Sequence, residues 1–193
     1  MSWATTVLES LSGPDDWWGF MVYRTTYESD QDWAYFKRMC DGMCRDVYAD
    51  SKDGAAVRER LHLEMVEDPS LEGADHEEVL RRFREHCWAN DWSSGRRGRN
   101  QCCVMVDKRA LMSVARRQKS TDPAHVVLVD RRYDHDDGEE NEDEEDYQDE
   151  EEDFHDDRAT LRVVLSELLD TFYIDLLSDL QFDEMVSDLL VKL

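Results

Sequence analysis

Arg24 is the residue whose chemistry most needs an explanation, because it lies inside an aromatic, β-branched stretch and is flanked by Tyr23 and Tyr27. A guanidinium buried without a partner is costly, so it must meet a carboxylate or an anionic ligand. One interpretation is a pocket for an anionic small molecule near Tyr23, Arg24 and Tyr27. The other is an internal ion pair with Asp107 or Asp130 at the ends of strands. We favour the ion pair, because buried pairs are a common solution to this problem.

Cysteine and histidine side chains could hold a metal ion or act in nucleophilic catalysis. The five cysteines are Cys40, Cys44, Cys87, Cys102 and Cys103. Two of them are spaced i, i+4, and a third adjoins His86, but the sequence has no Cys-x-x-Cys pair. Every cysteine also falls on a predicted apolar face, where cysteine is commonly buried. We therefore predict buried thiols with no metal and no cofactor, and no catalytic residue can be assigned because no nucleophile motif surrounds the histidines.

Acidic residues dominate one segment. The chain has 47 Asp and Glu against 23 Lys and Arg, a formal charge of −24, and residues 134–157 hold 17 acids and no Lys or Arg. Such a segment is too charged to bury, so we predict low-complexity disorder. It could capture a basic protein, with Tyr147 and Phe154 as anchors, or it could be a solvated linker. Phosphate would be repelled, which disfavours direct nucleic-acid binding.

Basic residues cluster in a loop around residues 96–99 and again near 116–119 and 131–132. They could contact phosphate or RNA, or they could partly neutralise the neighbouring acidic segment. We favour the second interpretation, because the basic clusters adjoin that segment in the sequence.

Four strand patterns alternate with three helix patterns after an N-terminal lead-in over residues 1–16. The strands are expected at residues 17–27, 61–65, 102–106 and 125–129. The helices are expected at residues 29–47, 75–90 and 108–118, with Ser29, Asp75 and Asp107 as N-caps. The order β-α-β-α-β-α-β predicts an α+β or small α/β core over residues 17–133, with one short-stranded sheet and packed helices.

The C-terminal residues 158–193 carry two apolar stripes at helical spacing. The first stripe runs from Leu161 to Phe172, and the second runs from Phe182 to Leu193. Both are too apolar to remain in water, so we predict a helical pair that docks on the core.

Part of the chain resembles a known group of proteins. Residues 18–27 read Trp-Gly-Phe-Met-Val-Tyr-Arg-Thr-Thr-Tyr, residues 104–107 read Val-Met-Val-Asp, and residues 126–130 read Val-Val-Leu-Val-Asp. This pattern resembles a widespread group of filamentous-fungal proteins of unknown activity. The resemblance covers roughly residues 17–132 and implies an intracellular fungal protein, without assigning catalytic residues.

The sequence favours a non-enzymatic protein–protein interaction module whose partner could be basic. The alternative is a small enzyme or binding protein for an anionic small molecule. No stretch is apolar enough to span a membrane, and the N-terminal residues lack the pattern of a signal peptide. The odd cysteine number is a poor disulfide framework, so we expect a cytoplasmic or nuclear protein.

Overall fold

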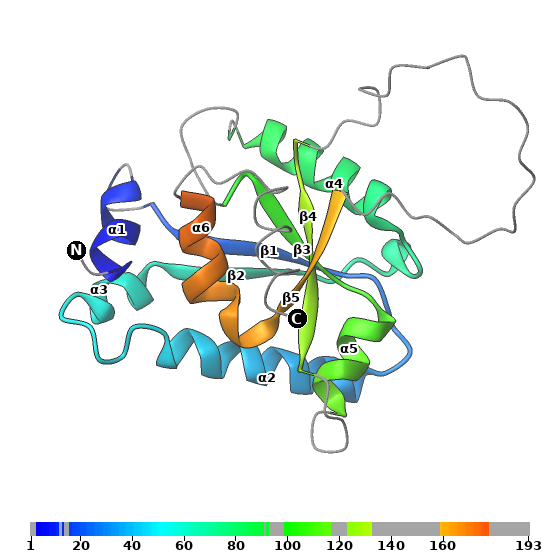
Figure 1. Ribbon diagram of the computed structural model, residues 1–193. Helices are drawn as coiled ribbons and strands as arrows, with labels where there is room; N and C mark the ends of the chain where they lie inside the picture. Colours follow the sequence, from blue (N-terminus) through cyan, green and yellow to red (C-terminus); the bar gives the residue numbers. More distant parts are fainter. Residues whose placement is uncertain are drawn as a thin grey trace, which may run out of the picture.

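A five-stranded mixed sheet forms the centre of the molecule (Figure 1). The computed structural model describes residues 3–11, 13, 16–90, 92, 99–116, 123–132 and 159–177. The strands are β1 (Trp18–Arg24), β2 (Leu61–Val66), β3 (Cys102–Val106), β4 (His125–Asp130) and β5 (Thr160–Val164). Their order across the sheet is β2-β1-β3-β4-β5. β1 is parallel to β2 and β3, whereas β4 is antiparallel to β3 and β5, which confirms the α+β class.

Helices cover the sheet unequally. The face that carries Phe20 and Val22 packs against five described helices and forms the larger core. These helices are α1 (Trp3–Ser10), α2 (Asp30–Asp46), α3 (Gly54–Glu59), α5 (Lys108–Ala115) and α6 (Tyr173–Leu177). The other face, which carries Met21 and Tyr23, packs against α4 (His76–Ala89). Figure 1 shows α4 on one side of the sheet and α2 on the other.

The three predicted N-caps are confirmed. The side chain of Ser29 accepts a hydrogen bond from the backbone N–H of Asp32 at 3.1 Å. Asp75 and Asp107 cap α4 and α5 in the same way, at 2.9 Å and 2.6 Å. Each cap satisfies a backbone donor that the first helical turn leaves without a partner.

The prediction of a helix that begins at Leu161 is wrong, because residues 160–164 form strand β5. Leu161 and Val163 are buried while Arg162 between them is exposed, which is the period of a strand. A 3₁₀ turn, a π-helical turn over Leu168–Phe172 and the short α6 follow. These turns pack into the larger core. The second predicted helix, over residues 182–193, lies outside the described residues.

Two further features were not predicted. Helix α3 begins at Gly54, where a Cβ atom would collide with the backbone carbonyl of Tyr48. Gly19 in β1 has φ +117°, and a Cβ atom there would collide with the backbone carbonyl of His62 in β2.

In the described part of the chain, no helix is both long and apolar enough to cross a membrane. The acidic segment, with Tyr147 and Phe154, lies outside it.

Candidate functional site

Arg24 is the last residue of β1 and is only 3% exposed. Its Nε donates a hydrogen bond to the carbonyl oxygen of Thr26 at 2.8 Å. One terminal nitrogen lies 2.8 Å from a carboxylate oxygen of Asp30, and the other lies 3.8 Å from Glu67. The predicted internal ion pair is therefore confirmed, and the guanidinium charge is already neutralised by this chain.

The predicted partners of Arg24 are nevertheless wrong. Asp107 caps α5 and lies 3.4 Å from Arg162, and Asp130 lies 3.5 Å from Arg132. The chain turns directly after β1, so Asp30 at the start of α2 reaches Arg24 from six residues away. A local turn supplies the carboxylate, instead of the neighbouring strand ends.

Aromatic rings complete the surroundings of Arg24. Its guanidinium carbon lies 4.1 Å from the ring centroid of Tyr27 and 5.2 Å from that of Trp33, which are cation–π distances. Lys37 binds Glu67 at 2.7 Å, and this hydrogen bond is the main reason that the pKa of Glu67 lies below its usual value. The cluster is internally paired and offers no free cation to an anionic ligand.

Tyr23 does not belong to this cluster. Successive side chains of a strand point to opposite faces, so Tyr23 lies on the α4 face and Arg24 on the α2 face. The Tyr23 ring packs edge-on against Phe83, and its hydroxyl reaches the Met21 sulfur, a weak acceptor, at 3.9 Å. Burial raises its pKa well above the usual value. The structure thus brings together Arg24 and Tyr27, but not all three predicted pocket residues.

The cysteine side chains are dispersed through both cores. Cys40 and Cys102 lie in the larger core, whereas Cys87 and Cys103 lie between α4 and the sheet. Burial raises the pKa of Cys40 to about 12 and that of the half-buried Cys44 to about 11. Thiols with raised pKa values are weak nucleophiles at neutral pH. Among the described residues, no group of three or more His, Cys, Asp or Glu side chains could hold a metal ion.

A groove between β2 and α4 was not predicted. Its volume is about 510 Å³, and Met21 and Tyr23 of β1 lie at its base. Glu64 and Val66 of β2 line one side, and the α4 residues line the other side. Those α4 residues are Arg82, Glu85, His86 and Ala89. Strands are about 4.8 Å apart and a helix is about 10 Å wide, so one helix cannot cover five strands.

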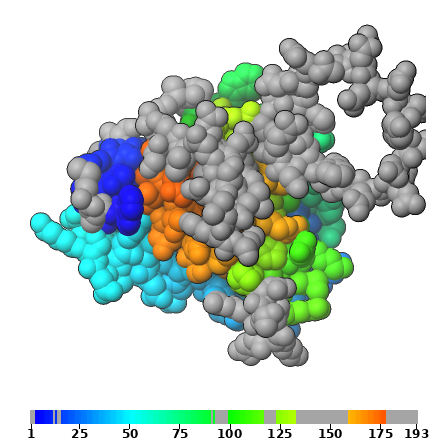
Figure 2. Space-filling view, viewed as in Figure 1, coloured from blue at the N-terminus to red at the C-terminus, as the bar shows by residue number. Residues whose placement is uncertain are grey.

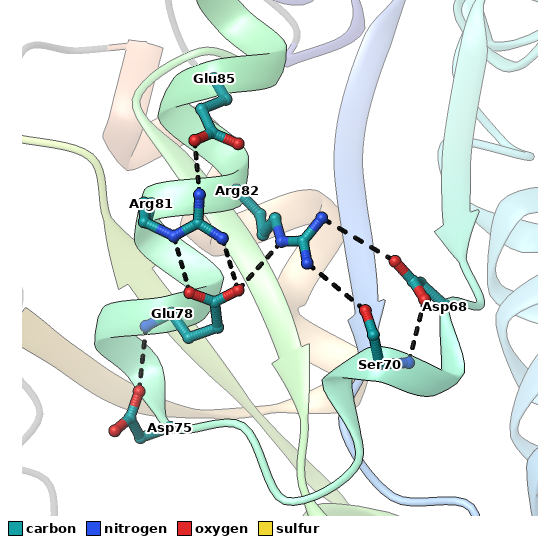
Figure 3. A network of polar contacts seen from close by, with 7 residues as sticks. All are labelled: Asp68, Ser70, Asp75, Glu78, Arg81, Arg82 and Glu85. Atoms are coloured by element: carbon teal, nitrogen blue, oxygen red, sulfur yellow. Dashed lines mark hydrogen bonds and ion pairs between the residues drawn. The ribbon is translucent and has the colours of Figure 1, made fainter.

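Charged side chains line the groove and continue along α4 (Figure 3). Arg82 binds Glu78 at 2.9 Å and reaches across to Asp68, just after β2, at 3.9 Å. Arg81 binds both Glu78 and Glu85, and the hydrogen bonds from Arg81 and Arg82 hold the pKa of Glu78 at about 2. The carboxylates labelled in Figure 3 are those of Asp68, Asp75, Glu78 and Glu85, and the guanidiniums are those of Arg81 and Arg82. The network is therefore net acidic.

An aromatic cluster adjoins the groove at His86. The ring centroid of Trp92 lies 4.9 Å from that of His86 and 5.8 Å from that of Trp17. The guanidinium of Arg99 lies between the two indoles, 3.6 Å from the Trp92 centroid, and is 3% exposed. Arg99 is therefore stacked between the two rings, whereas the rest of the basic loop, residues 93–98, lies outside the described residues. No sequence motif points to this cluster, because Trp17 is far from its other members in the chain.

One large apolar side chain near the groove is left in solvent. Trp88 on α4 is 82% exposed and lies beyond Glu85 on the outer side of the helix. A second hollow, of about 450 Å³, lies on the opposite face between α2 and residues 166–170. Figure 2 shows the C-terminal segment, in orange, lying against α2 there.

Comparisons with protein-family models, with curated proteins and with solved structures found no match to this chain. The resemblance to the fungal group stays a prediction, because no relative tests it.

Proposed function

We propose that this protein is a protein-interaction module whose described docking surface is the groove between β2 and α4. The observation that carries the proposal is the incomplete cover of one sheet face. A single described α-helix lies on that face, together with the 3₁₀ turn Pro69–Leu71, and a groove of about 510 Å³ over the buried Met21 and Tyr23 remains beside strand β2. Concave apolar surfaces with a few polar groups at the rim are typical binding sites.

The chemical groups of the described residues favour an interaction module over an enzyme. Arg24 is occupied by Asp30, Glu67 and the Thr26 carbonyl. The cysteine thiols are buried or half-buried, and their pKa values are raised by burial. The alternative of an anionic small molecule is the weaker proposal, because Tyr23 points away from Arg24 and the guanidinium charge is already paired.

The acidic segment would add electrostatic capture of a basic partner to this docking surface. Its 17 acidic residues between 134 and 157 attract positive charge over a Debye length of about 8–10 Å at physiological ionic strength. Tyr147 and Phe154 would be the apolar anchors within it. Deleting residues 134–157 should slow association and reduce its salt dependence, while docking in the groove continues.

Site-specific photo-cross-linking tests the docking surface in cells that make this protein. Benzoylphenylalanine replaces Glu85 at the groove or, as the matched control, Met43 in the second hollow on the opposite face. We expect discrete cross-linked proteins from the position of Glu85 and none of them from the position of Met43. Cross-links only from the position of Met43, or from neither position, would refute the groove as the docking surface.

A further inference from the structure

We propose that the partner at this groove is an extended basic segment that adds to β2 as a sixth strand. The inference rests on the proposed function and specifies the chemistry and conformation of the partner. Three observations carry it: the open edge of β2, the shape of the wall beside it, and the charge at the rim.

The edge of β2 has backbone groups available for pairing. Within the described sheet, β2 pairs with β1 alone. The carbonyl oxygen of Arg60 accepts a hydrogen bond from the N–H of Trp18 at 3.0 Å. This bond shows which residues of β2 direct their backbone N–H and C=O groups toward β1 and which direct them away from it. The backbone groups of His62 and Glu64 therefore face β1, and those of Leu61, Leu63 and Met65 face the open edge. An added strand would find donors and acceptors at every second residue.

The sequence of β2 carries one charged side chain, Glu64, but lacks three other features that protect edge strands. Natural edges are often blocked by proline, by lysine or by a bulge. β2 reads Leu-His-Leu-Glu-Met-Val and pairs with β1 in an unbroken register from Leu61 to Val66. Such an edge is the usual template for strand addition by a peptide, in which the backbone gives affinity and pockets give specificity.

The groove gives alternate side chains of an added strand a place to bind. Glu64 and Val66 point to the α4 face, and α4 residues from Arg82 to Ala89 form the opposite wall. Seven residue steps of helix rise about 10 Å, and an extended chain covers this length in about three residues. The added strand would lie on the far side of β2 from β1, so long side chains on its α4 face would reach over Glu64 and Val66 toward the groove.

The charge at the rim selects a basic segment. Glu64 makes no ion pair within the described residues, and the carboxylates of Asp68 and Glu85 lie at the two sides of the same groove. Arg82 is the one Lys or Arg among the residues that line it, and Glu78 already binds this guanidinium. The formal charge of −24 on the whole chain attracts the same kind of partner.

A second copy of this chain fits the edge poorly. Pairing of two β2 edges would bring the two Glu64 carboxylates onto the same face of one sheet, close to each other. Like charges across a strand pair are destabilising, and two chains of charge −24 repel each other. The observations therefore favour a basic segment of another protein.

A peptide selection tests the proposal with the full chain. Random ten-residue peptides displayed on phage are selected on the immobilised protein, and the best are synthesised and titrated by calorimetry. We expect Lys or Arg at every second position. The Glu64→Lys variant should weaken binding at least tenfold. The matched control is Asp41→Lys, which makes the same charge change on the exposed side of α2, and should weaken binding less than threefold.

Backbone N-methylation then tests strand addition directly. Methylation of every second amide of the selected peptide should weaken binding at least tenfold, and methylation of the amides between them should have little effect. Uniform tolerance of methylation, helical or acidic selected peptides, or equal effects of the two Lys variants would overturn the inference. A dimer of the free protein in light scattering that Glu64→Lys dissociates would instead identify a second copy as the occupant. None of these results alone refutes the docking surface, which the cross-linking experiment tests.

Discussion

Replacing Arg24 by alanine should destabilise the fold far more than removing its closest carboxylate. Arg24 is almost fully buried, whereas the Asp30 side chain is 89% exposed although the two lie 2.8 Å apart. An ion pair with one solvated partner contributes about 0–1 kcal/mol. The Asp30→Asn variant should therefore lose less than about 1 kcal/mol of unfolding free energy.

The loss for Arg24→Ala has three sources. The hydrogen bond from Nε to the Thr26 carbonyl has a charged donor and contributes about 1.5–3 kcal/mol. Stacking of the guanidinium on Tyr27 contributes about 0.5–1 kcal/mol. Each buried methylene of the side chain contributes about 0.8 kcal/mol. The expected loss is about 4 kcal/mol, and Arg24→Met, which retains most of the apolar volume, should lose about half of that.

Urea unfolding followed by circular dichroism measures these differences in free energy. The double variant Arg24→Ala/Asp30→Asn shows how strongly the two residues are coupled, and we expect a coupling free energy below about 1 kcal/mol. If Asp30→Asn destabilised the protein as much as Arg24→Ala, the ion pair would dominate and the reasoning would be wrong. A loss below 1 kcal/mol for Arg24→Ala would also refute it.

Three further predictions concern the backbone, a helix cap and the buried thiols. Gly19→Ala should lower the free energy of unfolding in urea by about 2–4 kcal/mol, because Gly19 has φ +117° and an added Cβ atom would collide with the His62 carbonyl. In the control Gly13→Ala the added Cβ atom has no neighbour within 4 Å, so the free energy of unfolding should change by less than about 0.5 kcal/mol. Asp75→Ala should cost about 1 kcal/mol and lower the thermal midpoint, because the Glu78 N–H loses its acceptor; Asp75→Asn should retain most of the stability. Burial raises the pKa of the Cys40 thiol from 9.0 to about 12. Between these two pH values the thiol ionises in the unfolded chain but stays protonated in the folded protein. The contribution of Cys40 to stability is therefore complete below pH 9 and is lost as the pH rises toward 12. Unfolding free energies measured from pH 8 to 11 should fall, and should fall less steeply in Cys40→Ala; identical slopes would contradict the argument.

Much of the core could be predicted from local patterns. β1 is an apolar run that is buried along its whole length, and α2 and α4 begin at capping residues with an apolar stripe behind them. The C-terminal strand shows the limit of such patterns. Leu161, Leu165 and Leu168 fit a helical period, while Leu161, Val163 and Leu165 fit a strand period equally well. Pairing with β4 decides between them, and a pairing partner is not visible in a local pattern.

The candidate site was only partly predictable for a related reason. The need of Arg24 for a partner followed from its apolar neighbours, but the choice of Asp30 depends on the turn after β1. The groove depends on the order of strands and on the line that α4 takes across the sheet. The alternation of β2 predicted a half-buried strand, yet only the topology shows that it lies at the edge.

Residue-resolved amide hydrogen exchange of β2 tests the central claim most directly. It compares the free protein with the protein bound to a selected basic peptide. We predict that the amides of Leu63 and Met65, which face the open edge, exchange at least tenfold more slowly in the complex. The amide of Glu64, which faces β1, should already be protected and change little. Unchanged exchange at Leu63 and Met65, with protection elsewhere in the chain, would contradict docking at this edge.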